Sequence, residues 1–247
     1  MNSISANLNT MIKASEKASK ALIRDFGEIE KLQVSVKGPL DFVSNADIKA
    51  EKIIIEELMK AKKNYSVVSE ESGYKENKDK DNVWIIDPID GTSNFLHGIP
   101  HFAISIGLKS NNEIISGLIF DPIKDEMFYA EKNSGAYLNN KRIRVSMRRK
   151  LENCMFSIEK INNNNNKAFN TRNLGSAALD MAYVASGRFD GFFSKNLNLW
   201  DIAAGIIIVK EAGGMVNKID LNKNSKIKVL ASSTSINDKL VKNMENF

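Results

Sequence analysis

The first quarter of the chain has an apolar pattern that repeats at helical spacing. A first amphipathic helix is predicted over residues 3–27, with an apolar face of Leu8, Met11, Ile12, Ala18 and Leu22 and the small Ser15 between them. A loop over residues 37–47 carries Pro39 and places Ser44 as the cap of the next helix. That second helix is predicted over residues 45–62, with a buried face of Ala50, Ile54, Leu58 and Ala61.

Beyond residue 64 the period changes to that of β-strands. Short apolar runs between polar turns predict strands at 65–73, 82–88, 102–108, 114–120, 126–131, 189–193 and 228–233. Further helices are predicted at 176–187, 199–214 and 235–247, of which the second is apolar nearly all round. Polar composition predicts loops at 74–82 and 162–166, and the basic stretch 141–150 alternates like a surface strand and its turn. This alternation of strands and helices favours a mixed α/β fold built in layers.

The composition limits the kinds of protein that this chain can be. Its 247 residues fit a single compact unit, 1–247, with possible halves at 1–138 and 139–247. The net charge is +5, but the lysines form no long run, so nucleic acid is not expected as a partner. No segment approaches the roughly 18–20 consecutive apolar residues of a membrane span. The N-terminus also lacks the apolar stretch of a secretory signal, and a single cysteine, Cys154, suits a reducing cytoplasm.

Four acidic residues stand where an ionised carboxylate is costly. Glu70 follows the apolar run SVV, Asp87 follows VWII, and Asp90 lies three residues later. Asp201 opens the predicted buried helix. Buried carboxylates need a cation or hydrogen bonds, and converging acids repel one another unless a divalent ion lies between them. With one Cys and two His in the chain, the ligands would be oxygen atoms, which suits Mg²⁺, Mn²⁺ or Ca²⁺ better than structural zinc.

The segment DPIDGTSN, residues 87–94, combines those acids with a turn and a helix start. Pro88 fixes the turn, which leaves the Ile89 carbonyl available for coordination, and Gly91 allows close approach of the backbone to a ligand. If a helix begins at Thr92, its unpaired N–H groups would hold a phosphate. A capped Asp-Pro turn explains either Asp87 or Thr92 alone, but it does not explain the second acid together with the glycine. The combination indicates metal-assisted phosphoryl chemistry.

Three segments closely resemble the inositol monophosphatase family. They are SEES with Glu70, WIIDPIDGTSNF with Asp87 and Asp90, and WDIAAGIIIVKEAGG with Asp201. Two more, DFVSNAD and GSAALDMAYVASGRFDGFF, agree in order and spacing, so the resemblance covers nearly the whole chain. It implies an αβαβα sandwich, a homodimer, and hydrolysis of small phosphate monoesters with Mg²⁺, often inhibited by Li⁺.

The resemblance also implies a metal site of two or three Mg²⁺ ions. Glu70, Asp87 and the Ile89 carbonyl would hold the first ion. Asp87, Asp90 and Asp201 would hold the second, and a third, weaker ion would lie near Glu70. Two ions roughly 3.5–4 Å apart activate water on one side and stabilise the leaving oxygen on the other.

Catalytic and substrate-binding roles follow from the same resemblance. Glu70 and Thr92 would orient and deprotonate the attacking water, Asp201 would lie near the leaving group, and the segment 175–177 would line the alcohol side. The residues implied to contact the substrate are Glu70, Ile89, Asp90, Gly91, Thr92, Ser93, Gly175, Ser176, Ala177 and Asp201. Gly175 and Ser176 also stand at a predicted helix start, which would offer a second set of N–H donors.

One position departs from the family pattern and leaves the substrate open. Family members that act on inositol phosphate commonly carry a Glu six residues before the Trp of the WD pair, where this chain has Ser194. The first hypothesis is hydrolysis of inositol monophosphate or a related sugar or polyol phosphate. A 3′(2′),5′-bisphosphate nucleotidase or a histidinol-phosphate phosphatase is the alternative on the same fold. A nucleic-acid-binding or regulatory protein with a relic site is the hypothesis outside the enzymes.

Overall fold

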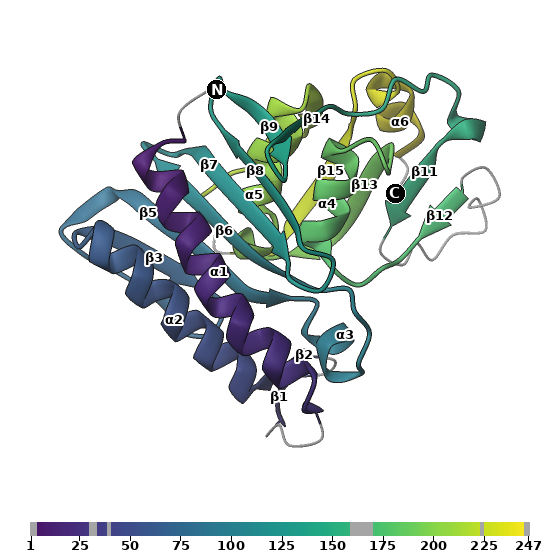
Figure 1. Cartoon of the computed structure of the whole chain (residues 1–247). Helices are drawn as coiled ribbons and strands as arrows, with labels where there is room; N and C mark the ends of the chain where they lie inside the picture. Colours follow the sequence, from purple (N-terminus) through teal and green to yellow (C-terminus); the bar gives the residue numbers. More distant parts are fainter. Residues whose placement is uncertain (1–3, 30–33, 39–40, 159–169, 223–224, 245–247) are drawn as a thin grey trace.

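Helices and sheets alternate in five layers (Figure 1). Helices α1 (Ala6–Phe26) and α2 (Asn45–Ala61) cover one face of an eight-stranded sheet. Helices α4 (Ala177–Ala185) and α5 (Leu199–Glu211) lie between that sheet and a five-stranded one, whose outer face packs on α6 (Asn237–Met244). The predicted αβαβα sandwich is confirmed. The structure is a computed structural model that describes residues 4–29, 34–38, 41–158, 170–222 and 225–244, so the loop predicted at 162–166 lies outside the described residues.

The eight-stranded sheet has the spatial order β10-β9-β8-β7-β6-β5-β3-β4. Its strands are β3 (Tyr65–Ser69), β4 (Gly73–Lys75), β5 (Asp79–Asp90), β6 (Ala103–Ser110), β7 (Glu113–Asp121), β8 (Glu126–Glu131), β9 (Gly135–Leu138) and β10 (Lys141–Ile143). Two of its hairpins turn at the pairs Asn111–Asn112 and Asn139–Asn140, and all four residues have positive φ. Two-residue hairpins of this kind need positive φ at both positions, which asparagine tolerates better than most residues.

The five-stranded sheet has the order β12-β11-β13-β15-β14. Its strands are β11 (Met155–Ile158), β12 (Asn170–Arg172), β13 (Gly191–Leu197), β14 (Gly214–Val216) and β15 (Ile227–Ser233). A small core between this sheet and α6 contains Phe156, Phe193 and the buried Cys154. Burial raises the pKa of the Cys154 thiol to about 11, so it acts as a small apolar residue and not as a nucleophile.

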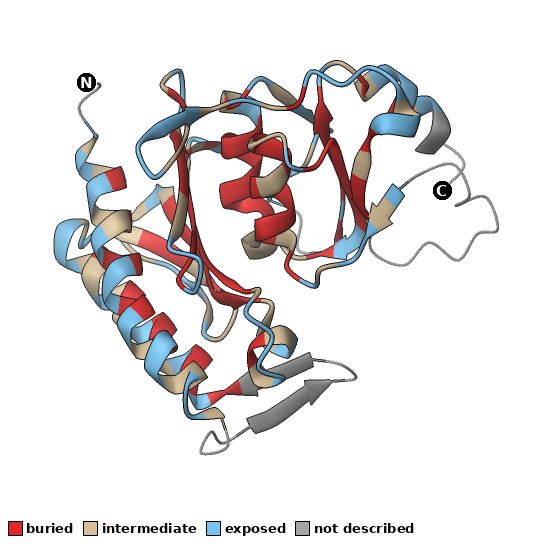
Figure 2. Ribbon diagram, turned by 45° about the vertical axis from the view of Figure 1, so that its right-hand side comes forward, coloured by how far each residue is buried: buried red, intermediate tan, exposed pale blue. Residues whose placement is uncertain are grey.

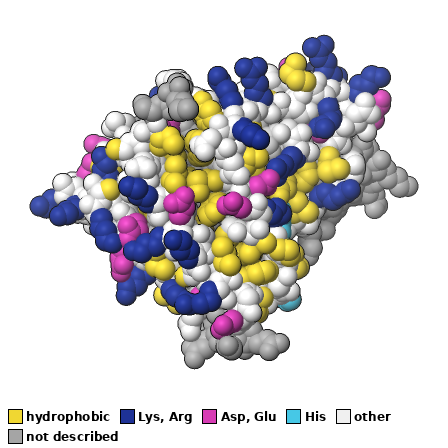
Figure 3. Space-filling model, in the orientation of Figure 1, with side chains coloured by type: hydrophobic (Ala, Val, Ile, Leu, Met, Phe, Trp, Pro, Cys, Tyr) yellow, Lys and Arg dark blue, Asp and Glu magenta, His cyan; other side chains and the backbone are white. Residues whose placement is uncertain are grey.

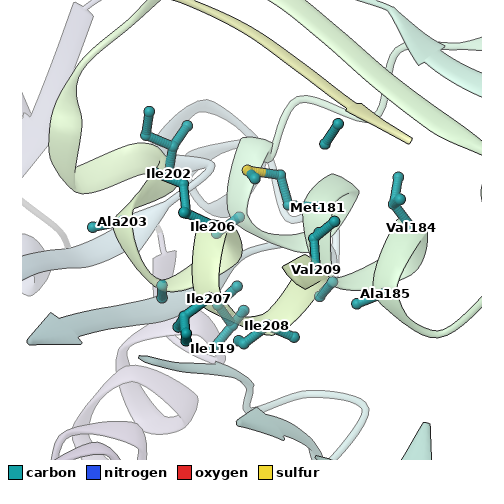
Figure 4. Close-up of a cluster of buried hydrophobic side chains, with 14 of the residues drawn as sticks. Ile119, Met181, Val184, Ala185, Ile202, Ala203, Ile206, Ile207, Ile208 and Val209 are labelled. Carbon is teal, nitrogen blue, oxygen red and sulfur yellow. The ribbon is translucent and has the colours of Figure 1, made fainter. Parts of the chain in front are cut away.

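The middle of helix α5 lies between the two sheets and is buried on every side (Figure 2). All residues from 202 to 209 are buried, as the continuous apolar pattern predicts. Figure 4 shows Ile207 and Ile208 of α5 beside Ile119 of β7. Because this core joins residues of both predicted halves, we propose that residues 1–247 form one compact unit.

Two glycines in the sheet allow α5 to lie close to it. A Cβ atom on Gly117 would lie 2.6 Å from the Ile207 Cγ2 atom and 2.7 Å from the Ala204 carbonyl oxygen. A Cβ atom on Gly107 would lie 2.9 Å from that of Ala203. All three distances are shorter than normal van der Waals contacts, so the close approach of α5 to the sheet depends on these glycines.

Gly117→Ala is expected to lower the free energy of unfolding by about 1–3 kcal/mol, because the added methyl group overpacks the core against α5. Urea denaturation monitored by circular dichroism measures the change. The matched control is Gly27→Ala, where φ is −72° and the nearest atom to an added Cβ is 3.4 Å away. The control should leave the stability equal or slightly higher. Equal effects of the two substitutions would contradict the close-approach argument.

Part of the loop predicted at 37–47 is a β-hairpin. Strand β1 (Val34–Gly38) pairs antiparallel with β2 (Asp41–Ser44). The β-branched and aromatic residues in VSV and DFV favour strands, and this preference outweighed the loop signal of the proline. Ser44 caps α2 as predicted, since its hydroxyl accepts a hydrogen bond from the Ala46 amide at 3.1 Å.

Three smaller predictions were wrong or only partly right. Ala61 is exposed and not buried, because α2 ends there. The loop predicted at 74–82 overlaps the short edge strand β4 and the start of β5, since an exposed edge strand accommodates polar residues. In the basic stretch 141–150 only the first three residues form a strand, and the rest has no regular structure.

The surface carries its basic residues in a dispersed way. Figure 3 shows lysine and arginine side chains spread over the face that is seen in the view of Figure 1, with acidic side chains among them. This is the distribution expected when the excess of lysine serves solvation. None of the helices in the described ranges is long and apolar enough to cross a membrane.

Candidate functional site

A cavity of about 270 Å³ opens where the parallel strands β3 and β5 end. Glu70 directly follows β3, and Asp87 and Asp90 are in the last four residues of β5. Because β3 and β5 run parallel, the three acids lie together at the carboxyl ends of these strands. Helix α3 (Thr92–Leu96) and helices α4 and α5 begin at the same place. The lining residues are Glu70, Asp87, Ile89, Asp90, Gly91, Thr92, Ser93, Asn173, Gly175, Ser176, Ala177, Asp180, Phe192, Leu197, Asn198 and Asp201. Every residue with a predicted site role is among them.

Asp87 and Asp90 are buried in this cavity, and the half-buried Glu70 and Asp201 add to the repulsion between the acids. Asp87 is 2% exposed and Asp90 is 8% exposed. Burial raises the pKa of Asp87 well above its usual range, and the charges that raise it further are those of Glu70, Asp90 and Asp201. Burial also raises the pKa of Asp90 to about 6, against the opposing effect of its hydrogen bonds. Such a cluster favours the binding of cations.

Asp90 is held by the start of helix α4. The Ser176 hydroxyl donates a hydrogen bond to the Asp90 Oδ2 atom, and the Ala178 amide donates to the same oxygen at 2.9 Å. The sequence predicts that N–H groups at this helix start are offered to a ligand, but in the structure the Ala178 amide serves Asp90. The helix start therefore positions a carboxylate of the site.

Asp201 reaches the cavity from the first turn of α5. Its Oδ2 atom accepts a hydrogen bond from the Asn198 amide at 2.7 Å, and the two residues form a capping box. The carboxylate that lines the cavity therefore also fixes the direction in which α5 starts. Movement of the loop before α5 would move Asp201 as well.

Asp47 is a residue of the site that the sequence analysis missed. The Thr92 hydroxyl has two acceptors for its single proton: the Ile89 carbonyl oxygen at 2.9 Å, and Asp47 Oδ1 at 3.1 Å, although 45 positions separate Thr92 from Asp47. Asp47 is fully buried at the start of α2, and burial raises its pKa in spite of hydrogen bonds from Ser44 and Thr92. The capping box with Ser44 explains this acid as a helix cap, so its sequence context concealed the contact with Thr92.

A glycine and an asparagine join the two loops that border the cavity. Gly91 has φ of +96°, and a Cβ on it would lie 3.1 Å from the His101 carbonyl and 3.2 Å from the Gly175 carbonyl. The Asn94 side-chain amide donates hydrogen bonds to the carbonyls of His101 and Leu174, each at 2.8 Å. Gly91 therefore serves close packing between backbone segments as well as the turn.

The cavity has a further acid in its lining, Asp180, whereas Ser194 is not part of the lining. Ser194 is 1% exposed within β13 and does not line the cavity. Asp180, on the first turn of α4, is 4% exposed, lines the cavity, and accepts a hydrogen bond from the Ser157 hydroxyl at 2.6 Å. An acid in the first turn of a helix is common, which is why the sequence did not single it out.

The cavity fits a hard divalent cation by its chemistry. Its acids and the Ile89 carbonyl offer oxygen atoms, and the burial of mutually repelling carboxylates is relieved by positive charge. Within the described ranges no three His, Cys, Asp or Glu side chains are grouped to hold an ion as they stand. Asp90 and Asp201 instead accept hydrogen bonds from backbone amides, which a cation would compete with or join.

Comparison with known families matches residues 5–246 to the inositol monophosphatase family. The chain belongs to this family. The resemblance seen in the motifs is thereby confirmed, and the family membership makes this protein a phosphoric monoester hydrolase.

Similar proteins within the inositol monophosphatase family carry two kinds of name. An inositol-1-monophosphatase of Rhizobium meliloti (strain 1021) is 47% identical over 224 residues, which cover 85% of this chain and 84% of the relative. The Nus factor SuhB of Xylella fastidiosa (strain Temecula1) is 40% identical over 223 residues, 85% of this chain and 80% of the relative. The crystal structure of extragenic suppressor protein suhB from Bartonella henselae matches with a TM-score of 0.90 and 45% identity, covering 96% of this chain and 98% of that chain.

Proposed function

We propose that this protein hydrolyses inositol monophosphate or a related sugar or polyol phosphate in a Mg²⁺-dependent reaction. The observation that carries the proposal is that the four proposed metal-binding acids, Glu70, Asp87, Asp90 and Asp201, line one cavity together with Thr92. A volume of about 270 Å³ lies just below the range of about 300–1,000 Å³ for pockets that take drug-sized ligands, which favours a small ester.

Five residues would hold the ions and keep them in place. They are Glu70, Asp87, the Ile89 carbonyl, Asp90 and Asp201. Charge neutralisation of the phosphate and activation of the attacking water are the chemistry that two or three bound Mg²⁺ ions would supply. Asp90 and Asp201 are each fixed to a helix start by an amide hydrogen bond, so their carboxylates are oriented in advance.

The protein side of the reaction is orientation and proton transfer. Of the two acceptors beside the Thr92 hydroxyl, Asp47 would take its proton when the Ile89 carbonyl holds an ion. The lone pairs of the Thr92 oxygen then accept a hydrogen bond from the attacking water. Glu70 takes the proton of that water. The segment Gly91–Ser93 holds the phosphate, and Asp201 lies on the side of the leaving alcohol. Attack in line with the leaving oxygen needs no covalent intermediate.

A panel of phosphate esters tests the proposed reaction. Steady-state rates should require Mg²⁺, disappear with EDTA and fall with Li⁺, and inositol 1-phosphate should be among the best substrates. A bisphosphate nucleotide with a kcat/KM about 100-fold above that of inositol 1-phosphate, equivalent to about 2.7 kcal/mol of transition-state binding, would establish the nucleotidase alternative instead. The same preference for histidinol phosphate would establish the other alternative.

Asp47→Asn is expected to lower kcat about 10–100-fold with little change in KM, because Thr92 loses a charged acceptor while the phosphate contacts stay in place. The Asn Oδ1 atom can still accept the hydrogen bond that the Ser44 amide donates in the capping box, so the fold should be retained. Rates at saturating substrate measure the effect. Thr92→Ser keeps the hydroxyl and should stay within a few fold of the natural enzyme, whereas Thr92→Val should match Asp47→Asn. An active Thr92→Val variant would rule out the role given to this pair.

Asp180→Asn is expected to raise KM for inositol 1-phosphate about tenfold, because the variant loses a charged acceptor for the sugar hydroxyls. The KM for p-nitrophenyl phosphate, which has no such hydroxyls, should stay the same. Asp238→Asn in the first turn of α6 is the matched surface control. Equal increases in KM for both substrates would show that Asp180 supports the fold and not specificity.

Relatives that are named Nus factors give a second candidate, a regulatory role outside hydrolysis. A role in binding RNA predicts an affinity that falls steeply with salt and survives Asp90→Asn. Filter binding at several salt concentrations, with the natural protein and this variant, measures it. Absence of salt-dependent binding leaves the hydrolase as the function.

The assembly and the compartment are also proposals. We infer a homodimer whose interface includes Ile99 and Ile123, because both are exposed large apolar side chains. The two residues lie on loops that the hydrogen bond from Lys124 to the Pro100 carbonyl joins. Sedimentation of the natural protein and of Ile123→Asp compares the oligomeric states. We infer a cytoplasmic location, in keeping with a single buried thiol, Cys154.

A further inference from the structure

A second cavity, of about 800 Å³, lies against the face of the large sheet that α5 leaves uncovered. Helix α5 packs mainly over β6, β7 and β8 and less over β5. The apolar floor of the cavity consists of Val68, Val83, Ile85, Leu199 and Leu221, with Trp200 at its side. A hollow of this size with an apolar floor is typical of a site for a small organic molecule.

The rim of this cavity is basic. Lys80, Lys109 and Lys226 line it, and no Asp or Glu is found among its described lining residues. Lys80 has an ion pair with Glu76 at 2.6 Å, which offsets part of its charge. Lys109 donates to the neutral Asn222 side chain at 3.2 Å and so keeps its full charge.

Two aromatic residues complete the lining. Tyr74, on the edge strand β4, lines the cavity and is 55% exposed, so its ring is accessible to a ligand. Trp200 is partly buried, and its Nε1 hydrogen finds no acceptor among the residues that the structure describes. The Trp200 Nε1 atom is itself shielded from solvent, so it is the two rings that are suited to a flat ligand.

This second cavity is distinct from the proposed catalytic one. The two lining sets share a single residue, Asn198. The catalytic cavity is acidic, so it requires cations before it can hold an anion, whereas the second is basic as it stands. Without bound metal, an organic anion is therefore attracted electrostatically to the second cavity and repelled by the catalytic one.

We propose that this second cavity binds a small aromatic anion of the nucleotide class, with its ring between Tyr74 and Trp200 and its anionic group on Lys109 and Lys226. The charge complementarity of the rim selects an anion, and the apolar floor selects a ring over a purely polar molecule. The proposed binding is additional to the proposed phosphatase reaction and does not depend on it.

Adenosine 5′-monophosphate in EDTA is the probe, because chelation prevents turnover. One of the two tryptophans, Trp84, is fully buried on the far face of the sheet, so quenching of fluorescence reports on Trp200. The expected result is saturable quenching with a Kd of about 10–100 µM, confirmed by calorimetry. Neutral adenosine should bind at least tenfold more weakly, and inorganic phosphate should not displace the probe at equal concentration.

Three variants locate the binding. Lys226→Glu and Tyr74→Ser should each weaken it about tenfold or more, while Lys218→Glu, a lysine outside this cavity, should leave it unchanged. Lys226→Glu should also retain the natural rate on inositol 1-phosphate, so that failure of this proposal is separable from failure of the proposed function. Absence of quenching up to 10 mM, equal binding of adenosine, or unchanged affinity in both cavity variants would each overturn the proposal.

Discussion

Asp90→Asn is expected to lower kcat about 10³-fold or more while the chain still folds. Asp90 belongs to the proposed metal site, and loss of one charged ligand removes several kcal/mol of transition-state stabilisation. A factor of 10³ corresponds to about 4.1 kcal/mol. The Asn Oδ1 atom can still accept the hydrogen bonds from Ser176 and Ala178, so the start of α4 keeps its partner.

Rates at saturating Mg²⁺ and substrate measure this effect, with circular dichroism as the test of folding. The matched control is Asp125→Asn, an exposed residue with φ of +53°, which asparagine tolerates equally well. It should keep the natural rate. An unchanged kcat in Asp90→Asn at saturating Mg²⁺ would refute the metal assignment, because a ligand cannot be neutralised without cost to the ion that it holds.

Asp87→Asn is expected to raise the free energy of unfolding in EDTA by about 0.5–2 kcal/mol and to abolish activity, the trade-off common at active sites. The raised pKa of Asp87 means that its charge destabilises the folded state at neutral pH, where burial and neighbouring acids oppose ionisation. The neutral amide removes that repulsion. Its Oδ1 atom can still accept the Ile89 amide hydrogen bond, which is 3.0 Å long in the natural protein.

Urea denaturation in EDTA and in Mg²⁺ measures the two halves of this expectation. Mg²⁺ should stabilise the natural protein by mass action and have little effect on Asp87→Asn. Asp121→Asn is the matched control, since Asp121 is as deeply buried but forms an ion pair with Lys124. That substitution should destabilise by about 1–3 kcal/mol, because it weakens a satisfied network. The same sign for both variants would contradict the repulsion argument.

Much of the fold is encoded in neighbouring residues. The apolar face of α1, the Asn-Asn hairpin turns and the continuous apolar pattern of α5 each depend on the conformations that a few adjacent residues prefer. Short strands such as β9 and β12 were not predicted, because three or four residues give too little pattern. Their pairing depends on the strand beside them.

The residues of the candidate site likewise fall into those that the sequence predicted and those that it did not. Glu70, the DPIDGTSN segment and Asp201 could be proposed from the sequence, because each combines a costly charge with a turn or helix start that limits its conformation. Asp47 and Asp180 could not, because each looks like an ordinary helix cap or first-turn acid until its distant partner is known.

The sequence alone determined most of the elements, the residues of the central motif and the family, since these follow from local conformational preference and from the cost of burying charge. Only the tertiary structure decided which groups meet. It placed Thr92 on Asp47, directed the α4 amide of Ala178 at Asp90, and left a basic, apolar-floored cavity beside α5. Contacts between residues 45 or 88 positions apart depend on how whole layers pack, and no short stretch of sequence contains that information.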